Sequence, residues 1–395
     1  MTTQVDVIII GGGMVGCTLA VALSQEPSLN ILIIEAVKPT PISETERFDL
    51  RICALNQASE SLLTQLAIWQ HIPSQRQGAF HKMIIWEDQH NSLEFNSTET
   101  DFPTLGTLVE NRQLQQAALH VCHQKPNITL TYDAPIKQQG QIITLANGTT
   151  YQAPLIVGAD GAQSQIRQWA EIPFTGDTYD QSAIVCTVTT EKTHQQTARQ
   201  RFLNSGPLAF LPLADPHQCN IVWSQTNHEA QQHMQSSNDD FIKQLNQAFD
   251  YQLGDILSIS QRASFPLQRR HAKHYVLDGL ALVGDAAHIV HPLAGQGVNL
   301  GLLDAVTLAD VVLDAHRQGQ AIGQHSVLMR YQRRRKADNI LMQGTIDSLH
   351  HLFTCPHPIT RLLRQLGLST INNTPTIKRY LMTHATGYRD GQLIR

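Results

Sequence analysis

The sequence lacks the features that mark membrane-spanning, exported or nucleic-acid-binding proteins. No apolar stretch approaches the length needed to cross a bilayer, and the first apolar run is too short and too closely bounded by glycines for a signal peptide. Only 16% of the 395 residues are charged, and a net charge of -4 gives no basic surface for nucleic acid. We therefore expect a cytoplasmic protein without a nucleic-acid partner.

Cysteine pairs, metal-ligand spacings and nucleophile motifs are also missing. Histidines gather near Cys355 without a recognised ligand spacing, so we expect no metal site. Neither Gly-x-Ser-x-Gly nor His-Glu-x-x-His occurs, which makes a bound cofactor the expected source of demanding chemistry. The six cysteines contain no Cys-x-x-Cys pair and are predicted to be reduced, mostly buried thiols: Cys17, Cys53, Cys122, Cys186, Cys219 and Cys355.

The start of the chain predicts a dinucleotide-binding unit. The apolar run 5–10 is typical of a parallel strand buried on both faces. It leads into Gly-x-Gly-x-x-Gly at Gly11, Gly13 and Gly16, followed by a helical pattern to about residue 24 and a second strand that ends in Glu35. The glycines allow a tight turn and the approach of a pyrophosphate, and Glu35 can accept from ribose hydroxyls.

A second strand–turn–helix pattern lies far along the chain and points to FAD rather than NAD. The apolar run 280–283 ends at Gly284-Asp285, and a glycine-rich turn at 295–297 opens a helical pattern from about Val298 to Leu313. Asp285 can accept from the hydroxyls of a polyol chain, and a helix N-terminus favours a ring that carries negative charge. NAD would need no such remote site, whereas FAD carries a ribitol and a large ring.

A third such segment, Ile156-Val-Gly-Ala-Asp-Gly161, is followed by Ser164 and Arg167. Along the chain the motifs come in the order Gly-x-Gly-x-x-Gly, Asp-Gly and Gly-Asp. In that order they resemble the single-component flavin aromatic hydroxylases, and the likeness covers nearly the whole chain. More narrowly, the chain resembles the FAD-dependent hydroxylases of ubiquinone biosynthesis, most closely the bacterial 2-polyprenylphenol hydroxylases. The segments that carry this narrower resemblance are 51–59 (RICALNQAS), 108–111 (LVEN), 209–213 (AFLPL), 221–223 (IVW) and 291–301 (HPLAGQGVNLG).

The expected fold is α/β, with a Rossmann-like FAD-binding domain, an inserted antiparallel-sheet substrate domain and a helical C-terminus. The FAD-binding domain is predicted from residues 1–75, 104–178 and 270–320, and the substrate domain from 80–100 and 179–269. Residues 321–395 form the predicted helical region. Within it the basic run 331–336 predicts a solvated helix face, with contact to anionic lipid headgroups as the alternative.

Several residues are predicted to bind the cofactor. From the motifs themselves, Gly11, Gly13, Gly16 and Glu35 should hold the ADP half, and Asp285 the ribitol. The resemblance adds residues that approach the adenosine, pyrophosphate or flavin ring in this class: Arg51, Asn111 or Arg112, Asp160, Pro292, Gly295, Gln296, Gly297 and Asn299. His288 and His291 flank the Gly-Asp segment and are the nearest candidates for a base, but no catalytic base is assigned.

The resemblance implies hydroxylation of a polyprenylated phenol in ubiquinone biosynthesis, at ring carbon 5 (also numbered 6). Oxygen is the implied co-substrate and NAD(P)H or another donor the source of electrons. The implied partners are the polyprenylphenol lipid and a membrane surface or quinone-synthesis complex, and a homo-oligomer is left open. Three alternatives stay open: a hydroxylase of a small aromatic acid, a non-catalytic flavoprotein subunit, and a flavin reductase or oxidase that transfers no oxygen.

Overall fold

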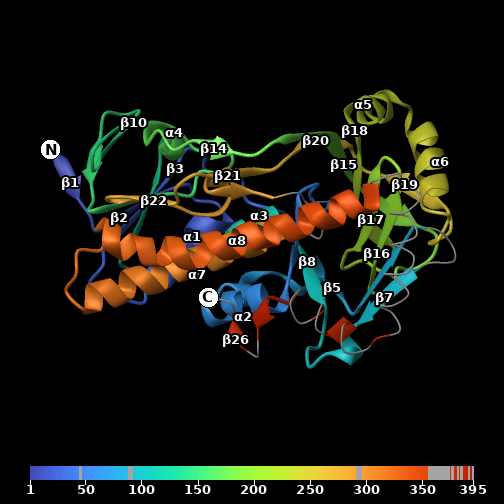
Figure 1. The fold of residues 1–395 in the computed structure, drawn as a ribbon, viewed down its shortest axis with the longest axis horizontal. Coiled ribbons are helices and arrows are strands. Elements are labelled where there is room, and N and C mark those ends of the chain that lie inside the picture. The colour runs from blue at the N-terminus through green and yellow to red at the C-terminus, as the bar shows by residue number, and fades with distance from the viewer. Residues whose placement is uncertain are drawn as a thin grey trace.

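Figure 1 shows the computed structural model of the chain. The structure describes residues 1–43, 47–87, 92–290 and 296–354, together with 374, 378, 379, 382, 386–389 and 392–393.

A six-stranded sheet forms the core of the larger part of the molecule. Its order is β22-β23-β13-β2-β3-β9, and the five strands from β23 to β9 are parallel. The runs of Val, Ile and Leu in β2 and β13 are buried completely, as parallel strands covered on both faces require. The strands are β2 (Val7–Ile10), β3 (Ile31–Glu35), β9 (Ile128–Tyr132), β13 (Leu155–Gly158), β22 (Val276–Leu277) and β23 (Leu280–Leu282).

Helices and three small sheets surround this core. α1 (Met14–Leu23) packs against α3 (Asn111–His123) and α7 (Gln296–Arg317). One four-stranded sheet contains β1 (Thr2–Gln4), β12 (Thr150–Gln152), β11 (Ile142–Leu145) and β10 (Pro135–Gln139). The two three-stranded sheets contain β4 (Ile52–Leu55), β8 (Gly106–Glu110) and β5 (Gly78–Phe80), and β14 (Phe174–Thr175), β21 (Arg270–Ala272) and β24 (His288–Ile289). Short helical segments connect them: α2 (Gln57–Gln65), η1 (Trp69–His71), η2 (Ser74–Arg76), η3 (Ser97–Glu99), α4 (Gln165–Trp169) and η4 (Gly284–Ala286).

An eight-stranded, mostly antiparallel sheet forms the second large part of the molecule. Apolar side chains of its strands form a separate buried core that includes Phe210 and Trp223. Two helices, α5 (Asn227–Gln235) and α6 (Asn238–Ala248), follow β18 in the chain. The order is β19-β15-β18-β17-β16-β6-β7, with β20 beside β15. The bounds are β19 (Ile256–Ile259), β15 (Thr178–Thr190), β18 (Gln218–Thr226), β17 (Gly206–Pro212), β16 (Thr197–Leu203), β6 (Lys82–Trp86), β7 (Ser92–Asn96) and β20 (Ala263–Gln268).

The longest helix, α8 (His325–Thr354), connects the two parts. It packs along α7 and reaches β16 of the antiparallel sheet, where Met342 contacts Phe202. Figure 1 shows it running along the long axis of the molecule in front of α7. Among the described helices none is both long and apolar enough to pass through a bilayer.

The predicted α/β class, with a parallel dinucleotide-binding sheet and an inserted antiparallel sheet, is confirmed. The exact division into domains stays a prediction. One detail was wrong: the chain is not helical to its end, because β25 (Tyr388–Arg389) pairs antiparallel with β26 (Gln392–Leu393). The sequence between these strands is Asp-Gly, a strong signal for a two-residue hairpin that the helical interpretation overlooked.

Candidate functional site

The three sequence motifs meet at one edge of the parallel sheet. The carboxyl ends of adjacent parallel strands lie at the same edge, so the residues that follow them are brought together. Gly11 and Gly13 follow β2, Glu35 ends β3, Asp160 follows β13 and Asp285 follows β23. Backbone hydrogen bonds join the segments there: the Gly11 N–H donates to Ile34 (2.8 Å), Ala159 to Ile10 (2.8 Å) and Val283 to Gly158 (3.0 Å).

Glycine is needed for a different physical reason at each of the three positions of the first turn. Gly11 has a φ of 108°, and a Cβ there would lie 2.3 Å from the carbonyl oxygen of Ala159. A Cβ on Gly16 would lie 2.0 Å from the oxygen of Gly11, so α1 could not approach the turn. A Cβ on Gly13 would meet no described atom within 4 Å. Packing thus requires the outer glycines, whereas Gly13 faces open space at the start of α1, where a pyrophosphate fits.

Glu35 stabilises this turn from the neighbouring strand. Its Oε2 accepts from the Gly12 N–H at 2.7 Å, and its Oε1 accepts from the Val37 N–H at 3.1 Å. On the other side, the Gln115 side chain of α3 donates to the Gly12 carbonyl at 2.8 Å. The turn is therefore held in shape by side chains from two elements, and the Glu35 carboxylate lies where a ribose beside the turn could reach it.

Asp285 is exposed, yet protein atoms surround its carboxyl group closely. Desolvation raises its pKa, and the charges of His288 and Arg51 only partly oppose that rise. Arg51 lies just before β4, and its guanidinium stands 5.2 Å from the centre of the Phe265 ring of β20. An exposed carboxyl group with protein atoms close around it is suited to accept hydrogen bonds from a bound polyol.

Two buried oxygen atoms near this edge have no hydrogen-bond partner among the described residues. They are Oδ1 of Asp160 and Oδ1 of Asn111. The other Asp160 oxygen accepts from the N–H groups of Gln165 (2.7 Å) and Ile166 (3.2 Å), and desolvation raises the pKa of this carboxyl. Because buried polar atoms are nearly always paired, these two fit a site that a ligand completes. Arg112, the alternative to Asn111, is half-buried in the first turn of α3.

Asn299 is placed differently from the other predicted residues. Its side chain is buried, accepts from the Asn56 N–H at 3.1 Å and donates to the Ala54 carbonyl at 2.9 Å, so it joins α7 to the end of β4. Its contact with the cofactor stays a prediction. Gly297 lies in the first turn of α7. His291, Pro292 and Gly295, and the side chain of Gln296, lie outside the described residues.

Sequence analysis missed a buried polar cluster behind the Gly-Asp segment. Asp304 of α7 accepts from the Gly284 N–H (3.2 Å) and bonds Nε2 of His288 (2.5 Å) through one oxygen, and accepts from Nε of Arg335 (2.9 Å) through the other. Burial alone would raise the pKa of Asp304, but the charges of His288 and Arg335 outweigh it and lower the pKa to about 2. His288, a candidate base, is thus fully occupied at Nε2, and its buried Nδ1 lacks a partner in the described part of the chain.

The basic run 331–336 proved to have two faces. Arg333 and Arg334 are exposed, as predicted for a solvated helix face, but Tyr331 and Arg335 are completely buried. The prediction was wrong for Arg335 because composition alone does not reveal a buried carboxylate on another helix. The five described cysteines are buried and free, and burial raises the pKa of three of them, Cys53, Cys186 and Cys219, to about 12. The described residues contain no group of His, Cys, Asp and Glu that could hold a metal ion.

A parallel sheet with these three motifs along one edge, beside a large antiparallel sheet, is the architecture of FAD-binding monooxygenases. Two solved structures share it over their full length. p-Nitrophenol 4-monooxygenase PnpA from Pseudomonas putida DLL-E4 has a TM-score of 0.79 at 17% identity and covers 98% of this chain. PqsL from Pseudomonas aeruginosa has a TM-score of 0.77 at 20% identity and covers 93%. At these identities the likeness concerns the fold alone.

The model of the FAD-binding domain family matches residues 4–342, and the chain belongs to that family. Among curated relatives, 3-demethoxyubiquinol 3-hydroxylase of Escherichia coli (strain K12) is 37% identical over 98% of this chain and 100% of its own length. Ubiquinone hydroxylase UbiL of Rhodospirillum rubrum is 34% identical, over 97% of this chain and 89% of its own. Ubiquinone biosynthesis monooxygenase COQ6 of Danio rerio is 32% identical, over 96% and 89%.

The protein is accordingly an FAD-dependent monooxygenase, with O2 and a reduced electron donor as the co-reactants typical of the class. FAD, when bound, supplies the oxygen-activating chemistry, and the protein contributes binding and orientation. With FAD bound, Gly13 and the N-terminus of α1 would provide space and N–H donors for the pyrophosphate, Glu35 and Asp285 would provide acceptors for hydroxyl groups, and Asn111 and Asp160 would provide unpaired buried oxygens.

Proposed function

We propose that this protein hydroxylates the aromatic ring of a polyprenylated phenol in ubiquinone biosynthesis. The observation that carries the proposal is likeness over the whole length: relatives named as ubiquinone-biosynthesis hydroxylases are 32–37% identical and cover 96–98% of the chain. The residues at the sheet edge support it, because Gly13 leaves open space at the start of α1 and Asp285 offers an acceptor for a polyol. Carbon 5 (also numbered 6) is the proposed position of attack.

A strain that lacks this protein tests the proposal. We expect ubiquinone to fall sharply and a polyprenylphenol one oxygen atom short of the next intermediate to accumulate, measured by mass spectrometry of lipid extracts. The position of the missing hydroxyl, determined by NMR of that lipid, tests carbon 5 separately. Unchanged ubiquinone with no accumulated lipid would contradict the proposal and favour a small aromatic acid as substrate.

The lipid tail of such a substrate implies contact with a membrane surface, and we propose that the outer face of α8 makes it. Arg333 and Arg334 are exposed there, and one to two turns further Ile340 and Leu341 are 50% and 70% exposed. Basic residues beside apolar ones on one exposed helix face suit an anionic membrane, which attracts each arginine by roughly 1 kcal/mol.

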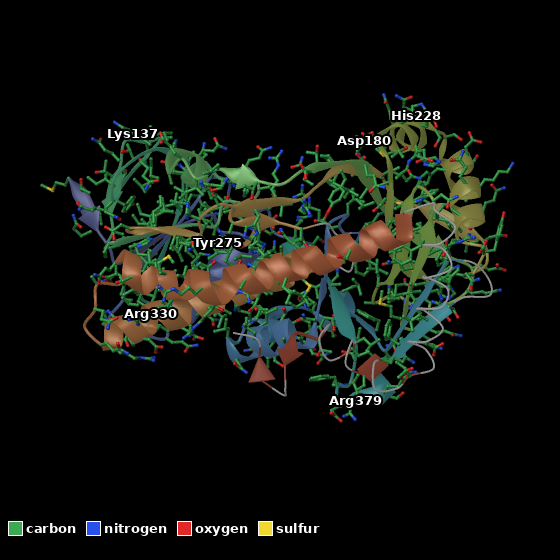
Figure 2. The ribbon with its side chains drawn as sticks, viewed as in Figure 1. Lys137, Asp180, His228, Tyr275, Arg330 and Arg379 are labelled. Carbon is green, nitrogen blue, oxygen red and sulfur yellow. The ribbon has the colours of Figure 1, made fainter. Side chains whose placement is uncertain are left out.

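The variant Arg333→Gln/Arg334→Gln is therefore expected to bind anionic lipid vesicles roughly thirtyfold more weakly than the parent, at roughly 1 kcal/mol per arginine. Vesicle co-sedimentation at low and high salt measures the loss. Ile136 and Lys137 of β10 offer a matched control, since they form another exposed apolar and basic pair; Figure 2 marks Lys137. If Ile136→Asp/Lys137→Gln weakens binding as much as the arginine variant does, the contact is nonspecific and α8 is not the docking face.

A further inference from the structure

The inner face of α8 carries a line of buried polar side chains spaced four residues apart. They are Tyr331, Arg335, Asn339 and Gln343, and none is more than 7% exposed. Residues four apart lie one turn above each other on the same helix face. Burying four polar side chains in a row is costly unless each finds partners, so their partners indicate what the line is for.

All four side chains hydrogen-bond either the segment that contains Asp285 or Asp304, which holds that segment. Tyr331 donates to the Leu282 carbonyl at 2.8 Å, just before the Gly-Asp turn, and Gln343 donates to the Ile289 carbonyl at 3.2 Å, just after it. Between them, Arg335 and Asn339 both donate to the same oxygen of Asp304, at 2.9 and 3.2 Å. Asn339 also donates to Tyr275 at 3.2 Å, and Figure 2 shows Tyr275 beside the middle of α8.

Asp304 connects these α8 side chains to the Gly-Asp turn. With Arg335 and Asn339 on one oxygen, its other oxygen is left for the Gly284 N–H and His288. Gly301, one turn before Asp304, packs closely against the Gly-Asp turn. A Cβ there would lie 3.2 Å from Cα of Gly284 and 2.8 Å from Val15 of α1. Gly284 itself has a φ of 59°. The backbone that presents Asp285 is thus fixed on both sides.

We propose that α8 is a positioning element for the FAD site, and that the Arg335–Asp304 pair sets the place of the Asp285 carboxylate by holding the Gly284 amide. The proposal rests on the assignment of Asp285 as a cofactor ligand. A buried ion pair is no better for stability than apolar groups of similar size, and often worse. The pair therefore serves to fix one geometry of the turn, and α8 acts on the cofactor without touching it.

The test separates stability from cofactor binding. Asp304→Leu/Arg335→Met removes both charges of the ion pair, so neither of them stays buried without the other. We expect its apoprotein to unfold within a few degrees of the parent but to bind FAD at least about tenfold more weakly, the loss of roughly one charge-assisted hydrogen bond. Thermal unfolding and titration of the apoprotein with FAD give the two quantities. Arg330→Met is the matched control, because Arg330 of α8 donates to the Gln320 side chain, outside the polar line, and its substitution should change neither.

A cycle with Asp285→Ala tests the route of the effect. If α8 acts through Asp285, adding Asp285→Ala to the double variant should weaken FAD binding much less than it does in the parent. Full additivity, or a double variant that binds FAD as the parent does, would overturn the proposal. Parent-like FAD binding by Asp285→Ala alone would instead refute the assignment of Asp285 itself.

Tyr331→Phe keeps the proposal testable if the double variant does not fold. The phenyl ring still fills its place, and only the hydrogen bond to the Leu282 carbonyl is lost. We expect FAD to bind about three- to tenfold more weakly, the effect of one neutral hydrogen bond. An unchanged FAD affinity in Tyr331→Phe would count against the role of the helix.

Discussion

Gly13→Val is expected to abolish FAD binding, by at least about a hundredfold in affinity, and to leave the apoprotein folded. The backbone of Gly13 (φ -76°, ψ -175°) is one that any residue adopts, and a Cβ there meets no described atom within 4 Å. The valine side chain would instead fill the space in front of the first N–H groups of α1, where we predict that the pyrophosphate binds. Absorption of the purified protein and titration of the apoprotein with FAD measure the loss.

Gly16→Val provides the contrast for this prediction. Its Cβ would lie 2.0 Å from the Gly11 oxygen, so this variant should disturb the fold itself and lower the unfolding temperature strongly. Circular dichroism of the two apoproteins should therefore differ, although both lose FAD. A yellow Gly13→Val protein with the FAD occupancy of the parent would show that the turn does not hold the pyrophosphate.

Asp285→Ala is expected to weaken FAD binding about tenfold to a hundredfold. The substitution removes an acceptor for ribitol hydroxyls, and charge-assisted hydrogen bonds contribute roughly 1.5–3 kcal/mol each. FAD titration of the apoprotein measures the change, with Asp314→Ala as control, since that exposed aspartate of α7 is 3.8 Å from Arg317 and remote from the motifs in sequence. Full FAD occupancy in Asp285→Ala would show that the Gly-Asp segment does not hold the ribitol.

The pKa of Asp285 predicts the accompanying effect on stability. Desolvation raises that pKa in the folded protein above its unfolded value. A carboxyl group with a raised pKa favours folding below its unfolded pKa, and that contribution is lost as the pH rises through the folded pKa. Above its folded pKa the Asp285 carboxylate therefore works against folding, and the Asp285→Ala apoprotein should melt no lower than the parent. The direction of this change in melting temperature distinguishes a ligand-binding carboxylate from one that stabilises the folded protein.

The sheet-edge site could be predicted because its signals are local. The Gly-x-Gly-x-x-Gly turn, Glu35 and Asp285 each lie at or just after the end of a strand, and the order of parallel strands then brings them together. The parallel pairing of β16 with β6, residues 197–201 with 82–86, could not be predicted in this way, because it joins segments more than a hundred residues apart. The inserted strand near Lys82 was predicted, but its neighbour in the sheet was not.

The polar cluster escaped prediction for a different reason. Arg335 lies within a run of basic residues, where the ordinary expectation is a solvated face, and its burial depends on Asp304, thirty-one residues earlier on another helix. The four-residue spacing from Tyr331 to Gln343 was present in the sequence, but polar residues at that spacing normally face water. For Asn299 the structure shows something that its motif did not indicate: both ends of its amide bond the backbone near β4, and its contact with the cofactor stays a prediction.

The dependence of Asp304 on Arg335 also sets how much chain is needed to make a flavin-binding unit. Every residue that we predicted to touch FAD precedes α8, so inspection of the motifs alone would place the end of that unit after α7. A chain that stopped there would take away the Arg335 partner of the buried Asp304 carboxylate and the hydrogen bond from Tyr331 to the Leu282 carbonyl. We therefore expect the smallest self-sufficient piece to extend to at least Gln343, one residue beyond the end of the family match at residue 342.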